Sequence, residues 1–177
     1  MSKLGFKEID AGNWLTPDPV VLHFAGMERA TDYVEAVLAP RLSGNVPEDI
    51  QKLFEVARSA VLYGYLFYPL YTLGMEQLLR IGEAAVASRC TQLGIPKDEK
   101  KFSDQIDWLA EHGMFDRGQF SAWLALRRLR NSASHPDRQS IVTPGSAIGF
   151  LDGVAGDINA LFEGESQIVE PGGDGKG

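Results

Sequence analysis

The residues best suited to chemistry lie together near the end of one predicted helix. A helix that begins near Asp116 should end at about His135, because Pro136 disfavours the α conformation in the residue before it. At 3.6 residues per turn, Asn131 and His135 stack on one face of this helix. Arg130 lies about 140° round the helix from His135. The pattern therefore gathers a cation, an amide and an imidazole at a helix C-terminus.

The surroundings of His135 act on its pKa in opposite directions. The carbonyl end of the helix dipole raises the pKa, whereas nearby arginines lower it. Arg128 lies on nearly the same stripe, seven residues before His135. An imidazole between such opposing effects can titrate near neutrality, which suits general acid–base catalysis.

The stretch Arg130-Asn131-Ser132-Ala133-Ser134-His135 resembles the signature of HEPN domains (higher eukaryotes and prokaryotes nucleotide-binding). That signature is an arginine, four to six residues and a histidine, often with a polar residue after the arginine. The helical layout of residues 47–163 also resembles this family. The resemblance implies a metal-independent endoribonuclease that needs no cofactor, often a toxin or a phage-defence effector.

The resemblance also implies roles for the motif residues. His135 would act as general base on the ribose 2′-hydroxyl, or as general acid on the leaving oxygen. Arg130 would stabilise charge on the phosphorane, and Asn131 would orient the phosphate or His135. HEPN-like proteins often carry an acidic residue that faces the site from the preceding helix. We match Glu83 to it, with Glu76 as runner-up.

Each of these assignments has an alternative. Glu76 and Glu83 are equally compatible with ordinary solvation, or with an ion pair such as Glu76 with Arg80 at i, i+4. Many HEPN-like domains have no shown catalysis and bind nucleotides or partner proteins, so a scaffold domain is the leading rival. In a purely structural role, Arg130 and Asn131 would cap helix carbonyls and His135 would end the helix.

Partners follow from the same resemblance. HEPN-like domains commonly form homodimers in which two motifs face one cleft, and toxins of this kind can bind an antitoxin or another partner protein. Apolar surface for a dimer is offered by the aromatic-rich residues 59–75 and by a glycine-lined last helix. The alternative is a monomer in which these residues form the core.

The amino-acid composition limits which fold class, cross-links, metal sites and location can be expected. The chain has 177 residues, of which 44% are hydrophobic and 23% are charged, as in one globular domain. Cys90 is the single cysteine, so no internal disulfide can form, and with three scattered histidines it cannot build a zinc site. The N-terminus lacks an apolar signal core, so we expect a cytoplasmic protein. The uncharged residues 59–75 are too short to span a membrane and contain Pro69.

The charge distribution points to a local basic surface. The net charge is −7, which argues against a general nucleic-acid coat protein. Residues 117–138 nevertheless carry five arginines against one aspartate. This is compatible with a small phosphate-bearing ligand, a nucleotide or a short RNA segment, although arginines commonly form a solvated helix face of the same composition.

The apolar periodicity predicts an all-α helical bundle of five or six helices, and the resemblance to HEPN domains implies a HEPN-like topology for it. We expect an N-terminal extension over residues 1–23, with Asn13–Pro19 extended or turned and pinned by Trp14. The helical domain should cover residues 24–163 and a disordered tail 164–177. The expected helices cover residues 27–42, 47–66, 69–93, 103–111, 116–135 and 144–162, and 47–66, 69–93 and 116–135 should form the core.

Several local features refine these helices. Gly94 and His112-Gly113 should end two of them, and Asp116 should cap the motif helix. Apolar spacing predicts two packed faces, one formed by Leu53, Val56, Ala57, Ala60, Val61 and Gly64 and the other by Phe120, Trp123, Leu126 or Ala125, and Leu129. The glycines at 145, 149, 153 and 156 weaken the last helix and suggest close approach to a neighbouring backbone.

Overall fold

A computed structural model describes residues 5–24, 30–95, 101–133 and 142–163. Within them the chain is all-α, which confirms the predicted class, and no strand is found there. The tail expected over residues 164–177 lies outside the described residues. The helices are α1 (Pro19–Phe24), α2 (Ala30–Leu38), α3 (Glu48–Tyr63), α4 (Leu70–Gln92), α5 (Phe102–Glu111), α6 (Arg117–Ala133) and α7 (Pro144–Glu163).

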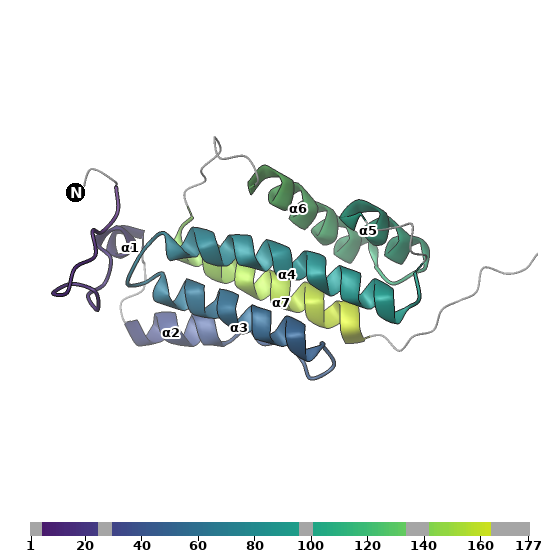
Figure 1. The fold of residues 1–177 in the computed structure, drawn as a ribbon, viewed down its shortest axis with the longest axis horizontal. Helices are drawn as coiled ribbons and strands as arrows, with labels where there is room; N and C mark the ends of the chain where they lie inside the picture. Colours follow the sequence, from purple (N-terminus) through teal and green to yellow (C-terminus); the bar gives the residue numbers. More distant parts are fainter. Residues whose placement is uncertain (1–4, 25–29, 96–100, 134–141, 164–177) are drawn as a thin grey trace, which may run out of the picture.

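Helix α4 runs through the middle of the molecule (Figure 1), with α3 and α7 packed most extensively against it. Helices α5 and α6 form a further layer over α4, on the side away from α3. The prediction that residues 116–135 form the third core helix is thus wrong, because α7 takes that place. Helix α6 contributes the buried Trp123 and Leu126, but α7 buries a longer apolar face that includes Leu151, Val154 and Ile158.

Helix α1 is the one helix in the described residues that the sequence analysis did not predict. The carboxylate of Asp18 accepts a hydrogen bond from the backbone N–H of Val20 at 3.0 Å, as an N-cap does, and Pro19 occupies the first helical position. The same carboxylate accepts from the N–H of Tyr68 at 2.9 Å. Asp18 is fully buried, so Asp18 pins the N-terminal arm, whereas Trp14 is 58% exposed.

The turns at the helix ends follow local sequence. Gly94 and Gly113 have φ angles of +73° and +72°, and they end α4 and α5 as predicted. The N–H of the residue after each glycine donates to a carbonyl in the last helical turn, which is the Schellman arrangement. Asp116 accepts from the N–H of Gln119 and donates its own N–H to the Gln119 side chain, both at 2.8 Å, which confirms the predicted cap of α6.

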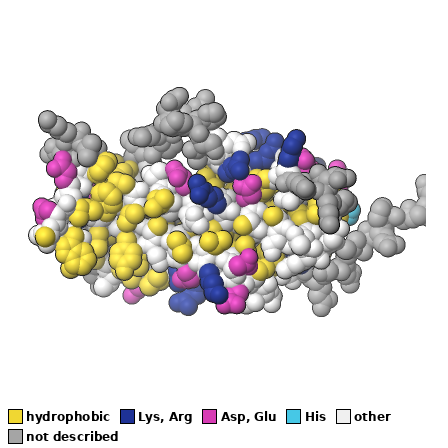
Figure 2. Space-filling view, viewed as in Figure 1, with side chains coloured by type: hydrophobic (Ala, Val, Ile, Leu, Met, Phe, Trp, Pro, Cys, Tyr) yellow, Lys and Arg dark blue, Asp and Glu magenta, His cyan; other side chains and the backbone are white. Residues whose placement is uncertain are grey.

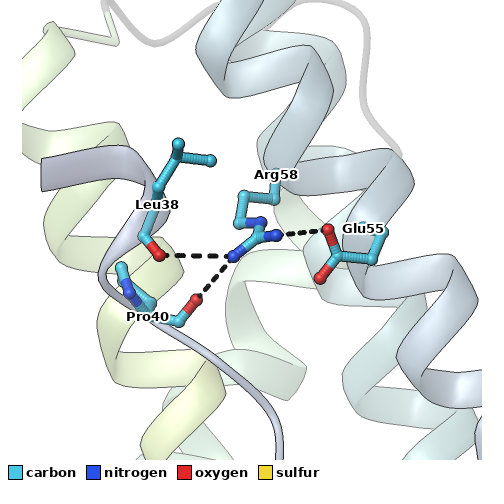
Figure 3. Close-up of polar contacts among 4 residues, drawn as sticks. All are labelled: Leu38, Pro40, Glu55 and Arg58. Atoms are coloured by element: carbon cyan, nitrogen blue, oxygen red, sulfur yellow. Dashed lines mark hydrogen bonds and ion pairs between the residues drawn. The ribbon is translucent and has the colours of Figure 1, made fainter. Parts of the chain in front are cut away.

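Arg58 of α3 fixes the C-terminal end of α2 (Figure 3). One guanidinium nitrogen donates to the carbonyls of Leu38 and Pro40, each at 3.3 Å, and another donates to Glu55. The side chain of Arg58 is only 14% exposed. Helix α2 therefore ends at Leu38, earlier than the predicted residue 42, because Pro40 cannot continue it and Arg58 satisfies its terminal carbonyls.

The buried face of α3 agrees only in part with the predicted one, since Ala57, Val61 and Gly64 are buried as predicted. Ile50, Phe54, Ala57 and Val61 are buried, whereas Val56 is 60% exposed and Leu53 is 39% exposed. The side chain of Val61 and the carbonyl of Ala57 lie where a Cβ on Gly74 of α4 would be, so the missing side chain lets α3 and α4 approach closely.

The aromatic-rich stretch 59–75 divides between core and surface. Tyr71 is fully buried, and its hydroxyl donates at 3.0 Å to the hydroxyl of Tyr33 on α2. Burial raises the pKa of Tyr71 to about 12. Tyr63 and Leu73, by contrast, are more than half exposed. No helix within the described residues is long and apolar enough to cross a membrane.

The glycines of α7 do not have the predicted close neighbours. A Cβ at Gly145, Gly149, Gly153 or Gly156 would have no described atom within 4 Å. All four lie on the exposed side of the helix, opposite the buried apolar residues. The close approach predicted there occurs instead at two glycines of α4, Gly74 and Gly82.

Candidate functional site

The candidate site begins at the contact between α4 and α6. A Cβ on Gly82 would lie 2.9 Å from a methyl carbon of Leu126 and 3.4 Å from the Trp123 ring. Because Gly82 has no side chain, α6 can place these two residues directly against α4. Arg130 lies one turn after Leu126 on the same inward face of α6, and Glu83 follows Gly82 on α4.

Arg130 and Glu83 form a two-point salt bridge across this contact. The Nε of Arg130 donates to one carboxylate oxygen of Glu83 at 3.2 Å, and an Nη donates to the other at 3.3 Å. The shortest distance between the charged groups is 3.1 Å. A forked arginine–carboxylate pair fixes the plane of the guanidinium. The Arg130 side chain remains 44% exposed, so the guanidinium is oriented and still reachable from solvent.

The other predicted site residues lie in different places. Asn131 and Arg128 are exposed on α6, and Asn131 lies about 100° round the helix from Arg130. His135 lies outside the described residues. Glu76 is half-buried on α4, about two turns before Glu83. The alternative ion pair of Glu76 with Arg80 is not formed, although the structure describes both residues.

The predicted basic surface is visible on α6. The helix carries Arg117, Arg127, Arg128 and Arg130, and it contains no acidic residue. In Figure 2 the dark-blue lysine and arginine side chains gather along the upper edge of the molecule, over α6. This concentration of positive charge on an acidic protein is compatible with an anionic ligand at that surface.

A second charged region lies on the other side of α4. A shallow groove is lined by Arg41, Leu42, Glu48, Gln51, Lys52, Glu55 and Arg58. Four of its five charged side chains are paired with one another, since Lys52 pairs with Glu48 at 2.7 Å and Arg58 pairs with Glu55. No group of three histidine, cysteine or acidic side chains that could hold a metal ion occurs in the described part of the chain.

Sequence analysis missed the role of Gly82 in positioning the pair. A glycine within a helix costs about 1 kcal/mol relative to alanine, so an isolated one indicates close approach by a neighbouring element. That signal is present at Gly82 and Gly74, but it is equally present at the open glycines of α7.

Comparison with known proteins gave no match, whether to a family model, to a curated protein or to a solved structure.

Proposed function

We propose that this protein is a HEPN-like, metal-independent endoribonuclease whose site is built on Arg130, Asn131 and His135. Arg130 stabilises the negative charge that develops on the phosphorane, and Asn131 orients the phosphate or the imidazole. His135 transfers the proton, as base towards the 2′-hydroxyl or as acid towards the leaving oxygen. The role of His135 depends on the resemblance of the motif, because this residue lies outside the described residues.

The salt bridge between Arg130 and Glu83 is the observation that carries the proposal. An exposed arginine normally samples many rotamers, and ordering it during the reaction costs free energy. Glu83 holds the guanidinium plane in advance, so Arg130 meets the reacting phosphate with less reorganisation. Glu83 is thus a positioning residue that acts through Arg130.

The wider biology is proposed on the same basis. Two copies would form a homodimer in which both motifs face one cleft, and the natural role would be that of a toxin or phage-defence effector. A protein partner such as an antitoxin would then control the nuclease. The basic surface of α6 supports an RNA substrate, since phosphate contacts contribute much of the affinity of proteins for nucleic acids.

The deciding experiment is incubation of the full-length protein with structured RNAs in EDTA. Arg130→Ala and His135→Ala should each lower the cleavage rate by roughly 100-fold or more, the usual cost of losing a charge stabiliser or a general acid–base. Arg41→Ala is the matched control, because it removes an exposed arginine that lies outside α6 and its basic surface. Cleavage that persists in both motif variants would overturn the proposal.

Glu83→Gln tests the positioning role separately. The amide keeps the size of the side chain but loses its charge, so Arg130 is held less firmly. We expect the cleavage rate to fall by roughly 10-fold or more, without a change in the pH dependence that His135 sets. A Glu83→Asp variant should recover part of the lost rate. If Glu83 were only a surface charge, neither variant would change cleavage.

The same salt bridge supports a second candidate function. An arginine tied to a carboxylate also joins α4 to α6, as expected of a non-catalytic scaffold that binds a nucleotide or a partner protein. Absence of cleavage across varied RNAs, with all variants folded, would favour this function. A large loss of stability in both motif variants would instead indicate a purely structural motif.

A further inference from the structure

Most of the large apolar side chains that are exposed in the described residues fall into two groups. The first lies on the N-terminal arm, residues 5–24, and consists of Ile9, Trp14, Leu15, Leu22 and Phe24. The second, here called the hairpin face, lies on the outer side of α3 and α4 and consists of Leu53, Val56, Tyr63 and Leu73. We propose that the arm of each copy docks on the hairpin face of a second copy. This inference rests on the proposed homodimer and not on RNA cleavage.

The arm is ordered by its own hydrogen bonds. The Lys7 ammonium donates to the carbonyls of Asn13 at 3.1 Å and Thr16 at 2.7 Å, which closes the loop. The Asp10 carboxylate accepts from the N–H groups of Gly12 and Asn13 at 2.7 and 2.9 Å. A loop that is already ordered loses little further entropy when it binds.

This ordered loop nevertheless holds its largest apolar residues in water. Trp14 is 58% exposed and Leu15 is 61% exposed. Tryptophan is among the residues that most often dominate the binding energy of protein interfaces. An ordered loop that presents Trp14 and Leu15 outward is thus suited to insertion against an apolar surface.

The arm is attached to its own chain through other residues. Asp18 binds the connection between α3 and α4, the Phe6 ring packs edge-on against Phe67, and Phe24 stacks on Tyr68. These contacts fix the arm at one end of the α3–α4 hairpin. They leave Trp14 exposed, so the arm does not cover the hairpin face of its own chain.

The hairpin face is continuous along two packed helices. On α3, Leu53, Val56 and Tyr63 share one stripe with Ala60 between them. On α4, the corresponding stripe runs from Leu73 to the exposed Arg80 and includes the half-buried Glu76. Figure 2 shows hydrophobic side chains in yellow over the left half of this side of the molecule.

Several features favour a second copy as the occupant. Three of the nine side chains are aromatic and six are aliphatic, and at roughly half exposure they offer on the order of 600 Å² of apolar area per copy. Reciprocal docking of two copies would then bury roughly 1,200 Å², which is at the lower end of the range for specific interfaces. The charges also match, since Glu8 and Asp10 are exposed on the arm and Arg80 borders the hairpin face. Exchange of identical contacts closes a two-fold dimer and leaves neither surface exposed.

The test uses two variants of the full chain that each damage one side of the contact. Trp14→Ser/Leu15→Ser removes the apolar tip of the arm, and Val56→Glu/Leu73→Glu places charges on the hairpin face. All four residues are exposed, so circular dichroism should show unchanged helix content. Sedimentation equilibrium should show a dimer for the unmodified protein and a dimer dissociation constant raised at least ~30-fold in each variant. Val34→Glu on α2 is the matched control, because Val34 is exposed outside both surfaces.

Mixing the two variants decides whether the contact is between arm and hairpin face. A mixed dimer has one intact contact, because the hairpin-face variant keeps its arm and the arm variant keeps its hairpin face. Dimers should therefore reappear in the mixture at concentrations at which neither variant dimerises alone. No recovery on mixing, or a dimer unaffected by either variant, would overturn arm exchange and leave the homodimer intact. An unmodified protein that is monomeric would overturn both.

Discussion

Helix α4 makes two contacts of similar design but different character, one with α3 and one with α6. Each contact is centred on a glycine of α4, and each neighbouring helix carries an arginine paired with a glutamate. On the α3 side, Gly74 faces the backbone of α3, and Arg58 is 14% exposed with its nitrogens bound to carbonyls and to Glu55. Arg58 therefore binds the end of α2 rather than α4, and there it is largely closed off from solvent.

On the α6 side the corresponding groups are more open. Gly82 faces the flexible end of Leu126, and the Arg130 side chain is 44% exposed beside Glu83. An arginine that completes a helix terminus contributes mainly to stability, whereas one that is oriented yet reachable can meet a ligand. The difference indicates that the α3 side holds the fold together and the α6 side carries the candidate site.

The largest expected effect is the functional loss on the α6 side. Arg130→Met keeps the apolar stem but removes the charge, and RNA cleavage in EDTA should fall by roughly 100-fold, about 2.7 kcal/mol of transition-state stabilisation. The melting temperature should change by no more than a few degrees, because a partly exposed pair contributes about 0–1 kcal/mol. A large loss of stability with cleavage retained would reverse the assignment of the two sides.

The matched substitution on the α3 side should have the opposite profile. Arg58→Met leaves the carbonyls of Leu38 and Pro40 without their charged donor, so the free energy of unfolding should fall by about 2 kcal/mol. Urea titration followed by circular dichroism measures this loss. Well below the unfolding transition, cleavage should stay within roughly twofold of the unmodified protein. A cleavage defect as large as that of Arg130→Met would end the distinction between the two sides.

Local features of the fold were predictable because neighbouring residues determine them. Two helices end at Gly94 and Gly113 and a third begins at Asp116, and each of these signals acts within a single turn. The all-α class follows from apolar spacing over whole helices. The pair Asp18-Pro19 is also a local signal for the start of α1, although the sequence analysis predicts an extended or turned segment there.

The wrong predictions depend on which helices meet. On α3, the predicted residues Ala57 and Val61 are buried against Gly74. The prediction also included Leu53 and Val56, which are exposed, and omitted the buried Phe54. Leu129 was expected to be buried, but it is 46% exposed, since Arg130 occupies the inward position after Leu126.

The salt bridge of the candidate site likewise depends on which helices meet, so the sequence alone does not predict it. Glu83 and Arg130 were both named from the resemblance, but they are 47 residues apart and no local pattern predicts their salt bridge. The structure brings these two together through the packing of Leu126 on Gly82. The catalytic roles of Arg130, Asn131 and His135 stay predictions, to be tested by cleavage.

A smaller effect on stability should distinguish the contact of Gly74 with α3 from the contact of Gly82 with α6. In Gly74→Ala, the new methyl group would lie 2.8 Å from Val61 Cγ2 and 3.2 Å from its backbone nitrogen, and neither atom can move freely. Overpacking of this kind costs about 1–3 kcal/mol, of which the better helix propensity of alanine offsets about 1. Thermal unfolding should therefore show a net loss of roughly 1 kcal/mol. A variant more stable than the unmodified protein would show that the α3 contact is looser than its geometry indicates.

The smallest effect is expected on the α6 side, at Gly82→Ala. Its new methyl group would lie 2.9 Å from the end of the Leu126 side chain, which can rotate away, so the packing cost should nearly cancel the propensity gain of about 1 kcal/mol. Gly153→Ala is the reference for the effect of helix propensity alone, because no described atom lies close to the new methyl group. It should raise the free energy of unfolding by about 0.5–1 kcal/mol. Urea titrations of all three proteins at one concentration measure the differences. If Gly82→Ala lost as much stability as Gly74→Ala, the α6 contact would be as rigid as the α3 contact.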